Sequence, residues 1–202
     1  MTTTSHRTRW GLIALLSLLV AGCALATFAA QADPVAGIRM AIRSTARTSL
    51  LLFCAAFGAA ALHARWPGAA TRWLRANRRE LGLSFAASHT MHAAALATLH
   101  QASPGTFAAL VNPAMWVLGG LGYVFIAAMA LTSTNAAQRA MGANWRRLHL
   151  IGGYYLAIGL FNGVIKHLNE GAIYWLMATL VVSVLVLRWT QPRRQGLALG
   201  KV

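Results

Sequence analysis

Long apolar segments separated by short polar connections dominate this sequence. A helix needs about 20 mostly apolar residues to cross the hydrocarbon core of a membrane. The segments are unbroken, whereas the strands of transmembrane barrels alternate apolar and polar residues, so a barrel is excluded. We therefore predict an all-α, integral membrane six-helix bundle that forms a single domain over residues 1–202. The predicted spans are 10–31, 47–64, 81–101, 112–132, 148–167 and 172–190.

The basic residues are distributed unevenly between the two sides of such a bundle. Loops and ends that face the cytoplasm carry an excess of Lys and Arg. The rich side comprises Arg7, Arg9, Arg65, Arg72, Arg75, Arg78, Arg79, Arg139, Arg146, Arg147, Arg188, Arg193, Arg194 and Lys201. The poor side comprises Arg39, Arg43, Arg47 and Lys166. This asymmetry predicts an N-in, C-in, multi-pass protein of a bacterial inner (plasma) membrane, in contact with membrane lipid.

The composition of the chain limits the kinds of functional site and partner that it can have. The chain is 57% hydrophobic, 10% charged and has a net charge of +15. Because the basic residues flank apolar segments, we attribute this charge to a membrane and expect no nucleic-acid partner. With only three carboxylates, Asp33, Glu80 and Glu170, we expect no paired-carboxylate active site. Cys23 and Cys54 form no CxxC pair, so neither a structural zinc nor a disulfide framework is indicated.

The first apolar segment has two interpretations. Residues 19–23, LVAGC, are similar to a lipoprotein cleavage site, and the sequence AQA before Asp33 is similar to a signal-peptidase site. The apolar run nevertheless continues past Cys23 to Ala30, as a full span would, and we expect a retained helix. Cleavage at Cys23 or after Ala32 would leave five spans with the same orientation.

Histidines lie inside the predicted spans. The segment LGLSFAASHTMHAAALATLH (81–100) carries three, and the fifth span begins at His149 and ends at His167. Ionisable side chains inside a membrane are costly and suggest function, and imidazole is a common haem ligand. His92 lies about 18 Å along its helix, near the middle of the bilayer, and His89 lies one turn earlier. A histidine at such a depth can also simply form a hydrogen bond with a neighbouring helix, and His100 and His167 are at interfaces where water solvates them.

Four stretches of the chain resemble one family. They are LTSTNAAQRAMGANWRRLH (131–149), ADPV (32–35), ART with S and L (46–50), and RRELGL (78–83) followed by a histidine at residue 92. In order and spacing they resemble the MsrQ/YedZ-like haem-binding membrane proteins, within the ferric-reductase-like transmembrane domain family. The resemblance covers most of the chain and is most specific in 131–149. It implies a six-helix b-type cytochrome that takes electrons from quinol or a cytosolic flavin reductase. It also implies a periplasmic molybdopterin-type reductase of methionine sulfoxide repair as the electron acceptor.

The resemblance also implies haem-binding residues. His92 and His149 match family histidines by position and are the candidate ligands for one or two haem b groups, while quinone or FMN would be supplied by a partner. Arg146 and Arg147, beside His149, are candidates to pair with haem propionates. The family has a second histidine 13 residues after the first on the fifth span, but this chain has Asn162 there.

An amide is a poor ligand for haem iron, so the Asn162 position leaves three alternatives open. In the first, the haem is five-coordinate. In the second, either His89 or His167 substitutes as the cofactor-binding residue. In the third, the chain has lost a haem. No catalytic residue, hydrolytic site or dinucleotide-binding unit is expected. The competing hypotheses are a haem-less or haem-poor membrane partner or assembly subunit, which Asn162 favours, and a polytopic transporter, for which no repeated Gly/Pro-interrupted spans are present.

Overall fold

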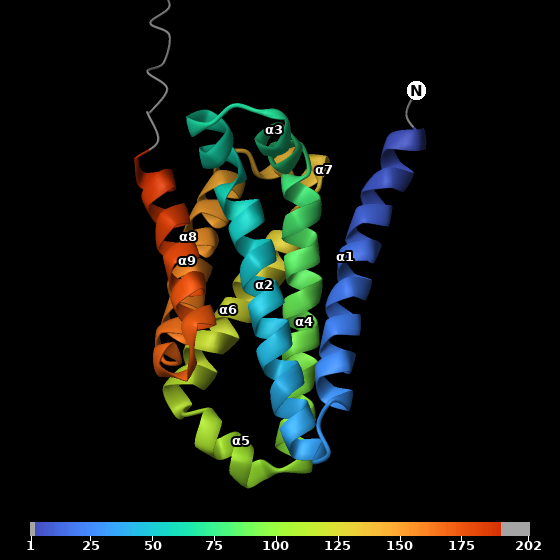
Figure 1. Ribbon diagram of the computed structural model, residues 1–202. Helices are drawn as coiled ribbons and strands as arrows, with labels where there is room; N and C mark the ends of the chain where they lie inside the picture. The colour runs from blue at the N-terminus through green and yellow to red at the C-terminus, as the bar shows by residue number, and fades with distance from the viewer. Residues whose placement is uncertain (1–2, 191–202) are drawn as a thin grey trace, which may run out of the picture.

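In the computed structural model, every described element is helical, which confirms the all-α prediction over residues 3–190 (Figure 1). The backbone is described from residue 3 to residue 190 and the side chains from residue 10, so the orientation argument from Arg7, Arg9, Arg193, Arg194 and Lys201 lies outside the described residues. The elements are α1 (Thr3–Ala29), α2 (Pro34–Arg65), α3 (Ala69–Ala76), α4 (Arg78–Ala102), α5 (Pro104–Leu110), α6 (Pro113–Leu131), α7 (Asn135–Met141), α8 (Ala143–Ile165), the 3₁₀ turn η1 (Leu168–Glu170) and α9 (Ala172–Trp189).

Five described helices are long and apolar enough to cross a membrane, namely α1, α2, α6, α8 and α9. They carry large apolar side chains that point away from the bundle, such as Leu18, Val117 and Leu176. A soluble monomer rarely exposes so much contiguous apolar surface. The chain is therefore described best as a multi-pass membrane protein. The predicted span 81–101 is also a helix, α4, but its polar side chains keep it outside the apolar group.

Helix α2 begins much earlier than the predicted span 47–64. The Asp33 carboxylate accepts a hydrogen bond from the backbone N–H of Ala36 at 2.7 Å, and Pro34 occupies the first helical turn. Both features favour a helix start at this point. Arg39 and Arg43, which the predicted spans left in the connection between the first two helices, therefore lie on α2, and the predicted start of this span was wrong. Hydropathy marks only the apolar part of a helix, whereas hydrogen bonding at the cap decides where it begins.

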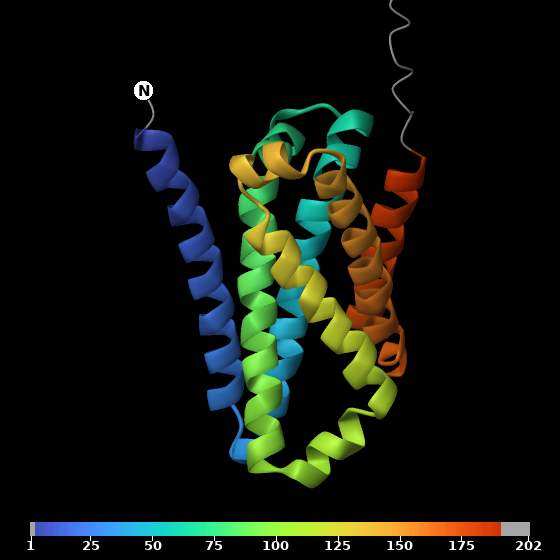
Figure 2. The same ribbon diagram turned by 180° about the vertical axis from the view of Figure 1, so that it is seen from behind.

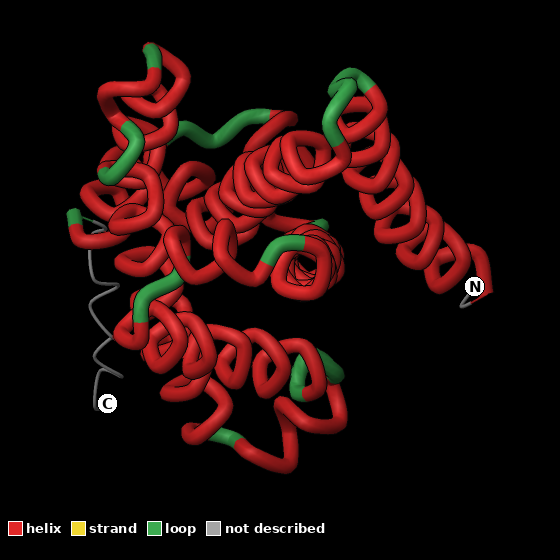
Figure 3. Tube along the Cα trace, turned by 90° about the horizontal axis from the view of Figure 1, so that it is seen from below, coloured by secondary structure: helices red, strands yellow, loops and turns green. Residues whose placement is uncertain are grey.

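The long helices run up and down between two ends of the bundle (Figure 1). The beginning of α1, the short helices α3 and α7, and the end of α9 lie at one end, which we call the α3/α7 end. The α1–α2 turn, α5 and η1 lie at the other, the α5 end. From behind, α6 crosses diagonally between α4 and α8 (Figure 2). Viewed from below, α1 lies at the edge, where it packs against α2 and α4 (Figure 3).

Exposed tryptophans lie at both ends of the bundle. Trp66, Trp73 and Trp189 are at the α3/α7 end, and Trp116 and Trp175 begin helices near the α5 end. Tryptophan is enriched where hydrocarbon meets the lipid headgroups, because its ring is apolar and its N–H is polar. This distribution of tryptophans is typical of a helical bundle with a membrane–water interface at each end.

The apolar core joins α2, α4, α6, α8 and α9, and Phe57 of α2 belongs to it. Its ring stacks on Phe53 at a centroid distance of 5.0 Å, and the guanidinium carbon of Arg188 lies 3.9 Å from its centroid. Gly153 of α8 allows the close approach, since a Cβ there would lie 2.7 Å from a Phe57 ring carbon. Small residues at such crossings are typical of helices that pack inside membranes.

Candidate functional site

His92 lies at the interface of α4 with α2 and is tied to α2 by its Nδ1 atom. That nitrogen is 3.1 Å from the hydroxyl oxygen of Thr45 and 3.1 Å from the carbonyl oxygen of Ile42. Both partners are nearly 50 residues away in sequence, so tertiary packing alone creates the contact. The ring of the main predicted ligand is thus held in one orientation by the neighbouring helix.

His89 lies one turn earlier on α4 and stacks on His92. Their ring centroids are 5.2 Å apart with 28° between the ring planes. The His89 ring also lies against Phe85 and Tyr123, at 5.4 Å and 5.1 Å. Its Nδ1 atom is buried and has no hydrogen-bond partner among the described residues. A buried polar atom without a partner is costly, and such atoms cluster at functional sites or at sites of strain.

A ladder of hydroxyl groups continues the α2–α4 contact towards the α3/α7 end. The Ser49 and Ser88 hydroxyls are 2.8 Å apart and fully buried, and Thr48 lies 3.4 Å from Ser88. Ser84, one turn further along α4, donates to the carbonyl oxygen of Glu80. These polar groups lower the hydropathy of α4, yet they are turned inward and satisfied by hydrogen bonds.

Asn162 of α8 lies at the same height in the bundle as the two histidines. On one side of it, Gly153 of α8 meets Phe57 of α2, and on the other side His167 lies beside the Arg43–Glu170 pair. Interpolation between these contacts places Asn162 level with the middle of α2, where α2 meets His89 and His92. The Asn162 side chain is exposed, because α8 packs mainly against α6 and α9 rather than α4.

His149 belongs to a separate place near the α3/α7 end. Its Nε2 atom is 3.4 Å from the Thr132 hydroxyl, and its ring lies 4.2 Å from that of Trp145. The Trp145 indole N–H donates to the Thr132 carbonyl oxygen at 2.9 Å. Helix α2 meets α8 at Phe57, near His149, and meets α4 at Thr45, near His92. These two positions on α2 are about 12 residues apart, or about 18 Å of helix. The structure therefore does not bring His92 and His149 together.

The candidate propionate partners Arg146 and Arg147 are both exposed at the α3/α7 end, on the first turns of α8. Their guanidinium groups are accessible to a ligand there. The histidine His167, a candidate substitute ligand, lies beyond the end of α8, where it precedes η1.

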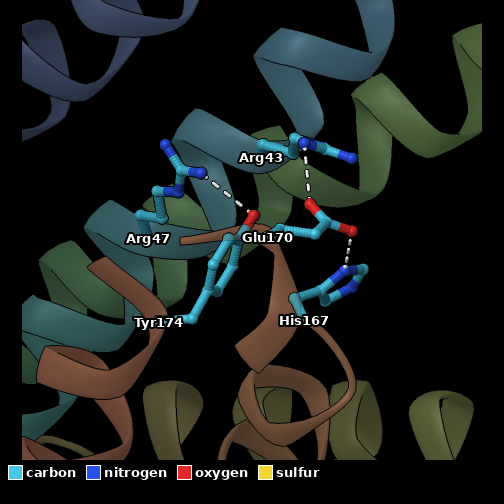
Figure 4. A network of polar contacts seen from close by, with 5 residues as sticks. All are labelled: Arg43, Arg47, His167, Glu170 and Tyr174. Carbon is cyan, nitrogen blue, oxygen red and sulfur yellow. Dashed lines mark hydrogen bonds and ion pairs between the residues drawn. The ribbon is translucent and has the colours of Figure 1, made fainter. Parts of the chain in front are cut away.

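A polar network that the sequence analysis missed holds η1 and α9 against α2 near the α5 end (Figure 4). Glu170 accepts from His167 Nδ1 at 2.7 Å and pairs with Arg43 at 3.0 Å. Arg47, one turn along α2, donates to the Tyr174 hydroxyl at 2.9 Å. The hydrogen bond from His167, and then the charge of Arg43, hold the pKa of Glu170 below its ordinary value. The four-residue spacing of Arg39, Arg43 and Arg47 was the available signal, since it places them on one helix face.

His167 is thus already engaged by a carboxylate in this network, and His89 stacks on His92 from the same helix. Within residues 3–190 no group of three or more His, Cys, Asp or Glu side chains gathers as it would around a metal ion. A haem does not need such a group of side chains, because its iron takes at most one imidazole on each face of the porphyrin ring.

Comparisons with known proteins leave the family of this chain open. No family model matches it, and no solved structure matches it. The class that the structure supports is an all-helical, multi-pass membrane protein.

Proposed function

We propose that this chain is a b-type haem electron carrier of a bacterial inner membrane, with His92 as its principal iron ligand. The observation that carries the proposal is the His89–His92 pair, two stacked imidazoles inside a helical bundle, one tied to α2 and the other with an unpartnered buried nitrogen. Aromatic and apolar neighbours around them suit a porphyrin ring. When bound, the haem would supply one-electron exchange, while the chain holds the imidazoles and excludes water.

In this proposal α4 is the sixth span. Its 25 residues are about 37 Å long, more than the roughly 30 Å of hydrocarbon to be crossed. Its hydroxyl groups Ser84 and Ser88 are buried rather than turned to lipid. Six spans place both ends of the chain on one side, as the arrangement of α1 and α9 supports.

The orientation proposed is N-in, C-in. The α3/α7 end carries Arg65, Arg72, Arg75, Arg78, Arg79, Arg139, Arg146, Arg147 and Arg188 among the described residues. The α5 end carries Arg39, Arg43, Arg47 and Lys166, and two of the three carboxylates. The positive-inside rule assigns the α3/α7 end to the cytoplasm.

Two histidine positions at different depths suit an electron path across the membrane. His149 lies near the cytoplasmic end of this orientation, with Arg146 and Arg147 available for propionates, and the His89–His92 pair lies nearer the periplasmic end. The donor would be quinol or a cytosolic flavin reductase, with FMN held by that partner. The acceptor would be a periplasmic molybdopterin-type reductase of the methionine sulfoxide repair type.

A second candidate function is a haem-less or haem-poor partner or assembly subunit. Asn162 favours it, because the amide stands level with the histidine pair where the resembling family has an imidazole. Asn162 does not fit as an axial ligand, so the proposed carrier has one imidazole at this site or recruits His89.

The visible spectrum of the purified full-length protein tests the proposal. A carrier shows a Soret band with b-type α and β bands, and His92→Ala removes the haem of this site. Asn162→His should convert a five-coordinate, high-spin iron into a six-coordinate, low-spin one and raise haem retention. A colourless wild-type protein after expression with added haem precursor would support the partner subunit instead. Full haem binding by His92→Ala, with an Asn162→His spectrum like that of the wild type, would refute the assigned site.

A further inference from the structure

We propose that Thr45 is a positioning residue for His92: together with the Ile42 carbonyl it keeps the His92 proton on Nδ1 and so presents Nε2 as the nitrogen for a metal. The consequence for metal binding rests on the proposed function. The proton assignment itself does not, because it follows from hydrogen bonds within the protein.

The argument begins with the Ile42 carbonyl oxygen, which can only accept a hydrogen bond. It lies 3.1 Å from His92 Nδ1, so that nitrogen must carry a hydrogen to form the bond. A neutral imidazole has one N–H, and its other nitrogen is then an acceptor with a free lone pair. The tautomer is thus assigned from the geometry of its partner.

Thr45 agrees with this assignment and strengthens it. Its hydroxyl oxygen lies 2.8 Å from the Ala41 carbonyl and 3.0 Å from the Ile42 carbonyl, both of which can only accept. The hydroxyl hydrogen is therefore committed to the backbone of α2. Its oxygen lone pairs remain to accept the second branch of the His92 Nδ1–H bond, at 3.1 Å.

The arrangement has a chemical effect beyond orientation. A ligating imidazole that donates its other N–H to an acceptor becomes a stronger electron donor to the metal, and such partners fix the ring plane and the tautomer. Thr45 is fully buried, so this acceptor is not exchanged for water. His89 lacks such a lock among the described residues, because its buried Nδ1 has no partner. His92 is therefore the histidine prepared for ligation.

Two neighbouring threonines allow a matched comparison. Thr48 lies one turn along α2 and also donates its hydroxyl to the helix backbone, at 3.0 Å from the Ser44 carbonyl, but it contacts Ser88 and no histidine. Thr45→Val removes the hydroxyl acceptor for His92 Nδ1–H with little change in volume and leaves the Ile42 carbonyl in place. Thr48→Val makes the same chemical change without touching His92. Thr45→Ser restores a hydroxyl at the critical position.

The first experiment reads the tautomer without haem. Full-length apo-protein labelled with ¹⁵N-histidine is placed in lipid nanodiscs, and the His92 signals are assigned by their loss in His92→Ala. The expected spectrum is a neutral imidazole with its proton on Nδ1. A neutral ring with its proton on Nε2 overturns the inference.

The second experiment measures haem affinity and midpoint potential in the same variants. Loss of such a partner typically weakens metal binding at least about 10-fold, so Thr45→Val should bind haem about 10-fold more weakly than wild type and at a higher potential. Thr45→Ser and Thr48→Val should remain near wild type. Equal affinity and potential in Thr45→Val and Thr48→Val overturn the positioning role.

The two experiments separate the inference from the proposed function. An Nδ1-protonated His92 in a wild-type protein that takes up no haem supports the proton assignment and overturns the carrier. A haem-binding protein whose Thr45→Val variant is unchanged supports the carrier and overturns the positioning role.

Discussion

Gly153→Ala tests whether the contact between Gly153 of α8 and the Phe57 ring of α2 limits the stability of the bundle. The added Cβ would lie 2.7 Å from one Phe57 ring carbon, closer than real Cβ contacts come, and 3.2 Å from the next, which is tight. The ring cannot easily yield, because Arg188, Phe53 and Tyr154 pack around it. Overpacking of this kind costs about 1–3 kcal/mol, whereas Gly→Ala in a helix gains about 1 kcal/mol. The steric cost should therefore win.

Gly159→Ala on the same helix is the matched control. A Cβ at Gly159 has no atom within 4 Å, so this variant keeps the helix-propensity gain without the clash. The difference between the two variants isolates the steric term, which we expect to be about 1–3 kcal/mol against Gly153→Ala. Reversible unfolding of both proteins in mixed micelles, followed by circular dichroism, measures it. A Gly153→Ala protein as stable as Gly159→Ala would refute the packing argument.

Three further outcomes follow from the structure. In a chain whose native Cys23 and Cys54 are replaced by Ser, cysteines introduced singly by Arg72→Cys and Arg139→Cys should be protected from an impermeant thiol reagent added outside spheroplasts. External labelling of either would reverse the proposed orientation. In the folded state the pKa of Glu170 lies below its ordinary value of 4.5, so the ionised carboxylate stabilises the protein above pH 4.5, and this stabilisation is lost as the pH falls through the lower, folded-state pKa. Glu170→Gln should therefore reduce the dependence of the unfolding free energy on pH in this acid range. An unchanged dependence would contradict the role given to Glu170. His149→Ala should lower bound haem or shift its spectrum, whereas an unchanged haem content and potential would reduce His149 to an interfacial residue that contacts Thr132.

Much of the helical architecture was accessible from local pattern. The predicted segment 112–132 differs from α6 by one residue at each end, 172–190 differs from α9 by one residue at its end alone, and the all-α class is confirmed over the described residues. A helix satisfies its own backbone hydrogen bonds, so an apolar run long enough to cross a membrane is sufficient to predict it. The short helices α3, α5 and α7 lie in connections too polar or too brief to carry that signal.

The relationships between helices were decided by tertiary packing. The sequence places His92 and His89 one turn apart, but nothing local pairs His92 with Thr45 and Ile42 or leaves the His89 Nδ1 without a partner. The same holds for Arg43, which lies outside the predicted spans and which α2 instead carries to Glu170. Apolar periodicity is set by neighbours three or four residues apart, whereas the register of two helices depends on which side chains interlock over their whole length. That register places acceptors of α2 opposite His92 Nδ1 and leaves the buried His89 Nδ1 without one.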